Sequence, residues 1–505
     1  MASQAHNLPS SAGRASIWAL AVALLLVVVA GALLWNAAMV NDVAWQLWIG
    51  RQLAHGATLY TDIIETNPPL WFWAAIPVVD LAQLIGARPY HVLILSVLAL
   101  DVAALLLVRR LCRDMQPGVA IVLGFPVVTL LAFLDVFGQR EHLTLISIVP
   151  YLILVARRAE GLGSGRVLSI VVGVLAAAGI ALKPHFLLVP LALEMLLLVR
   201  ARRVSLRPEI LALGVFLIGY ALSVLMFASA YFLTTVPMMT LAYHGYDQPI
   251  LDLLHRPAVA MACLLLLSLP LYGWPRSSLA QAALVAGLAF LAAYLLQGKG
   301  WRYHGLPAMG CFALAILAEA ERFRWRAALL TQRAALVLAV GAALCLVLPL
   351  VEAVRHDNRT NALLATRDLK AGDVVGVLST SGGRYWPIPE ERHFIWPSRY
   401  MTYWMLIDAI DASRAGSRNP SLATLIRNVR RNAVDDLACH PPRRILEDRY
   451  NIPFLKTGLV RFFSVDPDFA RLMRAYRRGA DYGEFATYDL VGPIAYRPAT
   501  CRPIY

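Results

Sequence analysis

The chain has 505 residues, of which 59% are hydrophobic and 15% are charged, and its mean hydropathy is +0.61. Soluble domains are about 45–50% apolar and about 25% charged, so this composition indicates an integral membrane protein. Lys and Arg outnumber Asp and Glu by 46 to 32, which gives a net charge of +14. Because no basic run is dense, this charge indicates loops that face anionic lipid headgroups, and it argues against nucleic-acid binding.

Eleven apolar runs are predicted to cross the bilayer as helices. The first covers residues 17–39 and is long enough to cross about 30 Å of hydrocarbon. We expect it to be an uncleaved anchor, because it is longer than the apolar part of a signal peptide. The other ten runs lie near residues 91–108, 118–134, 143–156, 166–182, 185–199, 208–231, 257–273, 279–296, 303–320 and 331–351.

Arginine clusters lie between alternate runs, at residues 109–113, 157–166, 200–207, 276 and 321–326. The positive-inside rule places these loops in the cytoplasm, so the N-terminus is cytoplasmic and the segment after residue 351 is extracytoplasmic. This orientation holds only if residues 69–86 do not cross the membrane. They carry Pro77, Asp80 and Gln83, which favours an interfacial or re-entrant helix.

The predicted fold is therefore a polytopic α-helical membrane protein with about 11 transmembrane helices and a C-terminal soluble α/β domain. Residues 1–351 form the transmembrane domain, with a first outer loop at 40–90, and residues 352–505 form the soluble domain. In the soluble domain we predict strands at 374–379 and 443–448 and a helix at 400–412. Its two cysteines, Cys439 and Cys501, either form a disulfide or remain free thiols.

Ionisable side chains collect at the predicted outer ends of the spans, where such groups usually mark a site or a pathway. Four segments stand out: residues 41–56, 59–70, 135–143 and 297–307. The candidate site residues in and beside them are Asp42, Glu65, Asn67, Asp135, Arg140, Glu141, His142, Lys183, Lys299, Arg302, Tyr303 and His304.

Each pattern also has a structural explanation. Trp45 and Trp48 are three residues apart, a spacing that favours an aromatic belt at the membrane interface. Asp42 is suited to be a general base, but an Asp there also caps a following helix well. Lys299 and Arg302 are suited to bind phosphate, but basic residues at span ends also extend toward lipid headgroups.

These motifs resemble the GT-C superfamily of membrane glycosyltransferases, in particular the branch of protein O-mannosyltransferases and the aminoarabinose transferase of lipid A. Asp42 matches the acidic residue after the first span, and ETNPPL at 65–70 matches the Pro-Pro entry to an interfacial helix. Residues 135–142 match a second acidic site, and KGWRYHGLP at 299–307 matches a late basic stretch that contains Tyr. Asn67 stands where many members of this branch have Lys or His.

The resemblance implies transfer of a sugar from a polyprenyl-phosphate-linked donor to a glycan, lipid or protein acceptor, with inversion, at the outer face of the bacterial inner membrane. The implied catalytic residues are Asp42, Glu141 and Asp135. The implied donor-phosphate ligands are Arg302, Lys299, Arg140, Tyr303 and His304, and the implied substrate-binding residues are Glu65, Asn67, His142 and Lys183.

Three questions remain open at this stage. A divalent metal held by Asp135, Glu141 and His142 is one possibility, although their spacing fits no standard metal motif. A transporter with Asp101 and Glu194 along its pathway is an alternative from another class, although no internal repeat is visible. A lipid-linked polysaccharide ligase or polymerase is an alternative within the enzyme class.

Overall fold

The structure, a computed structural model, describes residues 11–115, 118–202, 205–325, 340–341, 343–345, 359–414, 419–450 and 457–504. The chain forms two compact units. We call them the helical unit, which comprises Met1–Ala37, Leu93–Tyr220 and Gln248–Arg355, and the mixed unit, which comprises Ala38–Val92, Ala221–Asp247 and His356–Tyr505. The predicted first outer loop therefore groups with the C-terminal residues, and the domain boundary expected near residue 351 stays a prediction.

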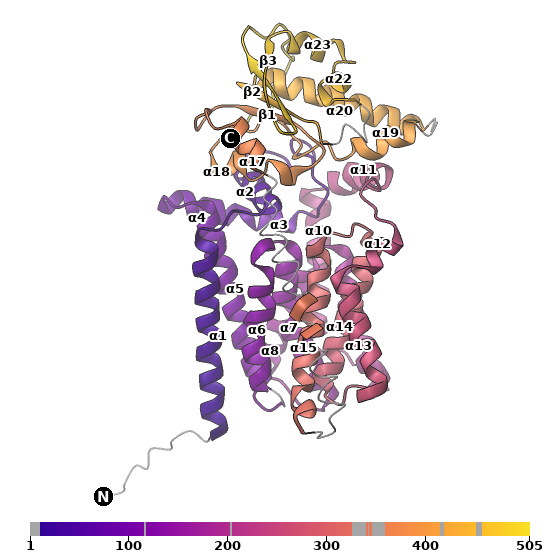
Figure 1. The fold of residues 1–505 in the computed structure, drawn as a ribbon. Helices are drawn as coiled ribbons and strands as arrows, with labels where there is room; N and C mark the ends of the chain where they lie inside the picture. Colours follow the sequence, from indigo (N-terminus) through magenta and orange to yellow (C-terminus); the bar gives the residue numbers. More distant parts are fainter. Residues whose placement is uncertain are drawn as a thin grey trace, which may run out of the picture. The chain divides into compact units, whose positions relative to one another are not determined.

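The helical unit is built from long apolar helices that run side by side (Figure 1). They are α1 (Ser11–Trp35), α5 (Pro89–Leu111), α6 (Gly118–Thr129), α7 (Arg140–Ala159), α8 (Arg166–Ile180), α9 (Leu188–Ala201), α10 (Pro208–Phe227), α13 (Pro257–Tyr272), α14 (Ser278–Gln297) and α15 (Arg302–Trp325). Shorter elements are η1 (Leu131–Val136), η2 (Pro184–Leu187) and α12 (Ile250–Leu254).

Six helical segments in the described residues are long and apolar enough to cross a membrane. They are Ile17–Trp35, Pro89–Leu111, Gly118–Val136, Arg140–Ala159, Pro208–Phe227 and Ser278–Gln297. The protein is therefore a multi-pass membrane protein, and the total of eleven spans stays a prediction. The eleventh predicted span, at 331–351, lies almost wholly outside the described residues.

Helix α7 lies at the centre of the helical unit. It packs against α8, α9, α14 and α15, and its side chains are buried from Arg140 through Arg157 except for Leu143. Helices α1 and α10, in contrast, expose many apolar side chains, as expected of helices that face lipid. The first turn of α7 is therefore enclosed by other helices of this unit.

The C-terminal part of the mixed unit contains a small four-stranded sheet. The strands are β1 (Val375–Leu378), β2 (Arg444–Asp448), β3 (Tyr476–Tyr482) and β4 (Phe485–Leu490), in the order β1-β2-β4-β3. Strands β1 and β2 are parallel, with Val375 opposite Arg444, and the other pairs are antiparallel. The two predicted strands and the α/β character of this part are thus confirmed.

The helices beside this sheet are α17 (Thr360–Ala365), η4 (Gly382–Arg384), α18 (Ile388–Glu391), α19 (Leu406–Arg414), α20 (Pro420–Cys439), α22 (Leu459–Phe463) and α23 (Pro467–Met473). The helix predicted at 400–412 was wrong in its first half, because α19 begins only at Leu406. Before it, the chain bends at residue 401 and turns at 404–405, and Tyr403 N donates to Ser379 O at 2.9 Å. The buried side chains of Tyr400, Tyr403 and Leu406, each three residues apart, fill the core there, which explains the helix-like apolar spacing.

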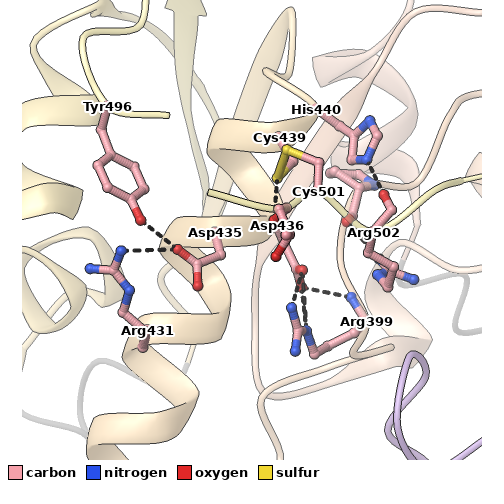
Figure 2. The surroundings of a disulfide bond; sticks show 11 residues. Arg399, Arg431, Asp435, Asp436, Cys439, His440, Tyr496, Cys501 and Arg502 are labelled. Atoms are coloured by element: carbon pink, nitrogen blue, oxygen red, sulfur yellow. Dashed lines mark hydrogen bonds and ion pairs between the residues drawn. A yellow bond between two sulfur atoms is a disulfide. The ribbon is translucent and has the colours of Figure 1, made fainter. Parts of the chain in front are cut away.

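A disulfide joins Cys439, the last residue of α20, to Cys501 near the C-terminus (Figure 2). Two carboxylates near the end of α20 also form hydrogen bonds with residues outside this helix. Asp436 accepts hydrogen bonds from the Arg399 guanidinium, and Asp435 accepts one from the Tyr496 hydroxyl at 2.9 Å. The structure thus favours the paired state of the two alternatives left open by the sequence.

The first outer loop forms α2 (Asn41–Ala54), α3 (Leu70–Trp73) and α4 (Ala75–Ile85), and the mixed unit also includes η3 (Tyr231–Thr235) and α11 (Val236–Ala242). The apolar segment Leu70–Ile85 is shorter than the six candidate spans. Its far end exposes Leu84 and Ile85, a feature typical of a helix that lies on lipid. The interfacial location of residues 69–86 stays a prediction.

Candidate functional site

The helical unit gathers most of the predicted polar residues around the first turn of α7. Asp135 lies in η1, and Arg140, Glu141 and His142 begin α7. Lys183 lies between α8 and η2, Lys299 follows α14, and Arg302, Tyr303 and His304 begin α15. We call these nine residues the polar cluster.

Glycines shape the connection from α14 to α15. Gly298 ends α14 in a left-handed conformation (φ 67°), and Gly300 is also left-handed (φ 65°). A Cβ atom on Gly300 would lie 3.1 Å from the Gln248 side chain, so a larger residue would be both strained and crowded. From the sequence, these glycines were expected to let the backbone approach a ligand closely; in the structure they let the chain reverse sharply between two long helices.

Asp135 and Arg302 form an ion pair. Nη1 of Arg302 donates to Oδ2 of Asp135, and both side chains are largely buried. Within the described part of the chain, Nε and Nη2 of Arg302 and Oδ1 of Asp135 are buried without a hydrogen-bond partner. A guanidinium with two enclosed donor nitrogens suits an oxyanion ligand such as phosphate.

Lys183 is the centre of a second group. Its Nζ atom donates to Glu141 Oε1 at 2.5 Å and lies 3.2 Å from both Gln297 Oε1 and His304 Nε2. The structure thus brings together three residues predicted from the sequence, which come from three separate segments. Gln297 was missed, and its only signal was a polar residue at the end of an apolar span.

The His142 ring has other contacts. Its ring packs between Phe133 and Phe137, with centroid separations of 5.1 Å each, and its Nδ1 atom accepts from Gly138 N at 3.0 Å. These contacts fix the turn that enters α7. The Tyr303 ring packs against the His304 ring, and Lys183 Nζ lies 5.9 Å from the centroid of the Tyr303 ring.

The two charges that a transporter would place along a pathway both have protein partners. Asp101 accepts a hydrogen bond from the Thr129 hydroxyl at 2.7 Å. Glu194 accepts one from the Tyr151 hydroxyl at 2.7 Å and pairs with Arg207. Each interaction gives its carboxylate a structural role, at a fully buried position for Asp101 and at a partly exposed one for Glu194.

In the mixed unit, Asp42 lies in the first turn of α2. The N-cap of this helix is Val40, and no side chain caps it, so Asp42 is not the capping residue considered above. Its side chain is half-buried. The structure therefore leaves the general-base hypothesis for Asp42 as a proposal and shows that the capping position belongs to another residue.

Glu65 and Asn67 interact with each other. Oε1 of Glu65 accepts from Nδ2 of Asn67 at 2.7 Å, and Oε2 accepts from the indole nitrogen of Trp45 at 2.8 Å. The carboxylate thus ties the ETNPPL segment to α2. Substrate binding by Glu65 and Asn67, which the family resemblance implies, stays a prediction.

The expectation that Trp45 and Trp48 form an aromatic belt was wrong. Both side chains are buried, and their rings stack at a centroid distance of 4.5 Å. Trp45 also meets the Trp386 ring edge-on at 5.3 Å. These tryptophans are therefore core residues between α2 and a segment more than 300 residues later in the chain.

Two acidic residues of α18 hold both ends of α2. Glu390 accepts two hydrogen bonds from the Arg51 guanidinium, at 2.8 and 2.7 Å, and Glu391 accepts one from Met39 N at 3.2 Å. Burial acts to lower the pKa of Arg51, but the hydrogen bond and charge of Glu390 outweigh it and raise that pKa above its usual value. This contact was not predicted.

The described residues contain no group of three or more His, Cys, Asp or Glu side chains that is arranged to hold a metal ion. Asp135 and Glu141 each interact with a basic residue instead, and His142 packs against aromatic rings.

Known proteins resemble this chain in structure but not in sequence. No protein-family model matches the chain, and no curated protein matches it in sequence. The crystal structure of ArnT from Cupriavidus metallidurans bound to undecaprenyl phosphate matches with a TM-score of 0.51 and 12% identity, over 97% of this chain and 100% of that one. The arabinofuranosyltransferase AftD from mycobacteria gives a TM-score of 0.43 and 15% identity, over 95% of this chain and 40% of that one.

The chain therefore shares the fold of ArnT over nearly its whole length, in agreement with the polytopic α-helical fold predicted from the sequence. At 12% identity the likeness to ArnT establishes the fold, and the chemistry has to be argued from this chain's own residues.

Proposed function

We propose that the protein is a glycosyltransferase that uses a polyprenyl-phosphate-linked sugar as its donor. The proposal rests on one observation about Arg302. Its guanidinium is largely buried, and two of its donor nitrogens have no hydrogen-bond partner in the described residues. The GT-C fold and the undecaprenyl phosphate bound to ArnT support the same class of donor. The arginine loops favour a site that faces the outside of the bacterial inner membrane.

Arg302 would bind the donor phosphate through its free edge. Asp135 holds the other edge through Nη1, so it fixes the orientation of the guanidinium. Lys299 and Arg140 are buried cations of the same polar cluster and would add to the positive potential, with Tyr303 and His304 beside them. Cations that neutralise the departing phosphate stabilise the charge that develops in the transition state.

Asp42 would act as the general base. It removes the proton from the acceptor hydroxyl while that oxygen attacks the anomeric carbon, and the bond from this carbon to the phosphate oxygen breaks. The electron pair leaves with the lipid phosphate, so no general acid is needed. Attack opposite the leaving group inverts the anomeric configuration. The acceptor is a glycan, a lipid or a protein with an accessible hydroxyl.

The proposal is tested with purified full-length protein in lipid nanodiscs. Labelled undecaprenyl-phosphate-linked hexoses and pentoses are supplied with cell-envelope lipid, glycan and protein fractions in separate reactions, and transfer of label is measured. Arg302→Ala should weaken donor binding tenfold or more, because hydrogen bonds to charged groups contribute about 1.5–3 kcal/mol. Arg302→Lys should restore only part of the loss.

Arg110→Ala is the matched control, because Arg110 is an exposed arginine of the same unit at the far end of α5. It should bind and turn over donor normally. Unchanged donor binding by a well-folded Arg302→Ala protein would contradict the phosphate site. Transfer from lipid-linked polysaccharide but from no lipid-linked monosaccharide would instead identify a ligase or polymerase.

A further inference from the structure

An open cleft lies between the end of α2 and α4, both in the mixed unit. The two helices approach closely at one point, where a Cβ atom on Gly50 would lie 2.7 Å from the Cβ atom of Ala75. Beyond this contact they leave a space of about 340 Å³, a volume in the range of small-ligand pockets. We call this space the α2–α4 cleft. Its polar lining consists of Arg51, His55, Asp80 and Gln83, and the other lining residues are apolar.

Three of these side chains offer hydrogen-bond acceptors to the cleft. Asp80 and Gln83 are three residues apart on α4, so they lie on the same face of the helix, and both are exposed. Within the described residues, the Asp80 carboxylate takes part in no ion pair. The Nδ1 atom of His55 lies 2.8 Å from the carbonyl oxygen of Arg51, which can only accept, so Nδ1 carries a proton. In the neutral ring, Nε2 of His55 is therefore an acceptor.

Arg51 adds hydrogen-bond donors to the lining of the cleft. Its Nη1 and Nη2 atoms each donate one hydrogen bond to Glu390, at 2.8 and 2.7 Å. A guanidinium has five N–H donors, so other N–H groups of Arg51 remain, and its side chain is 32% exposed. The cleft therefore combines a carboxylate and two neutral acceptors with the donors of a cation. This combination suits a ligand that carries one positive and one negative group.

A primary ammonium group matches the acceptors of the cleft. It has three N–H donors and no acceptor, which gives one donor for each of Asp80, Gln83 and His55. A quaternary ammonium has no N–H donor and cannot form these hydrogen bonds. A divalent ion such as Ca²⁺ takes about six to eight oxygen ligands, but only two of the four polar side chains carry oxygen. A phosphate close to the ammonium would accept from Arg51.

The surface of α4 beside the cleft is apolar. Leu81, Leu84 and Ile85 are 46%, 82% and 59% exposed. Leu81 directly follows Asp80 and Leu84 directly follows Gln83, so the acceptors and the apolar surface adjoin each other on one helix. Exposed leucines beside polar side chains are typical of a helix at the lipid–water interface, where phospholipid headgroups lie. A lipid is favoured over a free amine, because its acyl chains would cover this apolar surface.

We propose that the α2–α4 cleft binds a phospholipid headgroup that contains a primary ammonium and a phosphate, as in phosphatidylethanolamine. The ammonium donates to Asp80, Gln83 and His55, and the phosphate accepts from Arg51. The acyl chains lie against Leu84 and its apolar neighbours. The lipid is not a reactant in the proposed sugar transfer, so this inference stands independently of the proposed function.

The test measures lipid binding by the full-length protein in detergent, with native mass spectrometry of the first bound lipid. The probes are dioleoyl phosphatidylethanolamine, dioleoyl phosphatidylcholine, which has a quaternary ammonium, and glycerophosphoethanolamine, which has no acyl chains. The wild-type protein should bind the phosphatidylethanolamine at least about fivefold more tightly than either other probe. Asp80→Asn should remove the preference between the two lipids, because the ammonium loses its charged acceptor.

Two further variants separate recognition of the headgroup from a loss of folding. Asp411→Asn is the matched control, because Asp411 is an exposed carboxylate on α19 of the same unit, and it should keep the lipid preference. Combining Asp80→Asn with Gln83→Glu returns one carboxylate to the same face of α4 and should restore part of the preference. A purely structural role of Asp80 would not produce this recovery.

Four results would overturn the inference. Equal binding of the two lipids by the wild-type protein would contradict recognition of the ammonium. Binding of glycerophosphoethanolamine as tight as that of the phosphatidylethanolamine would identify a soluble amine as the ligand. A lipid preference that Asp80→Asn leaves unchanged would place the lipid elsewhere on the protein. If Asp80→Asn abolished sugar transfer together with the lipid preference, the molecule in the cleft would be a reactant.

Discussion

The ion pair between Arg51 and Glu390 should stabilise the mixed unit measurably. Its two hydrogen bonds are 2.8 and 2.7 Å long, the Glu390 side chain is 6% exposed and the Arg51 side chain is 32% exposed. Exposed pairs contribute about 0–1 kcal/mol, whereas removal of one partner from a buried pair costs about 3–5 kcal/mol. Arg51 is partly screened by solvent, so Arg51→Ala should cost about 2–3 kcal/mol by leaving a buried carboxylate unpaired.

Equilibrium denaturation in detergent micelles measures this cost. Tryptophan fluorescence is a suitable signal, because Trp45 and Trp386 pack between α2 and the segment that carries Glu390. The control is Arg443→Ala, which breaks a 3.2 Å pair with Asp373 in which the arginine is 57% exposed. The reasoning would be refuted if Arg51→Ala destabilised the protein no more than Arg443→Ala does.

Three further predictions concern topology, the disulfide and acid stability. A reporter active only outside the cytoplasm should be silent when fused after residue 113 and active after residue 138; the reverse pattern would mean that residues 69–86 cross the membrane. Cys439→Ser opens a loop of 62 residues and should cost about 4 kcal/mol, so a denaturation midpoint equal to that of wild type would contradict a stabilising disulfide. The hydrogen bond from Arg431 holds the pKa of Asp468 below its usual value of 3.8, so its stabilisation is present at neutral pH and is lost as pH falls through the lowered pKa. The difference in midpoint between wild type and Asp468→Asn should therefore vanish in strong acid, and a difference that persists there would contradict this origin.

The membrane helices could be predicted from composition because lipid imposes a simple requirement. A span must be long and apolar, so the run at 279–296 matched α14 (Ser278–Gln297) to within one residue. Strand β1 was found for a similar reason, since all four of its residues are buried and apolar or glycine. Both signals depend only on local sequence.

Other features could not be predicted from local sequence, because contacts with distant parts of the chain determine which of their side chains are buried. Strand β3 is exposed along most of its length, so its sequence YRRGADY shows no apolar alternation. Trp45 and Trp48 have the same spacing whether they face lipid or protein. Their burial depends partly on Trp386, whose position relative to α2 is invisible in the sequence.

The sequence indicated a set of candidate site residues, but it did not indicate which of them form hydrogen bonds or ion pairs with one another. Candidate side chains could be selected because charges are rare at the ends of apolar spans. The contacts of Lys183 with Glu141, Gln297 and His304 join helices distant in sequence, and no local pattern encodes them. Only the folded structure separates Arg302, which has free donor atoms, from Lys183, whose ammonium is surrounded by acceptors.

The central claim is base-assisted sugar transfer by Asp42, and the transfer rate of Asp42→Asn tests it most directly. Asn preserves size and hydrogen bonding but cannot take a proton, so transfer from the undecaprenyl-phosphate-linked donor should fall about 100-fold or more, with normal expression and donor binding. Asp80→Asn is the control, because Asp80 is an exposed carboxylate on α4 of the same loop, and it should transfer at the wild-type rate. A well-folded Asp42→Asn protein with near-normal transfer would contradict the account.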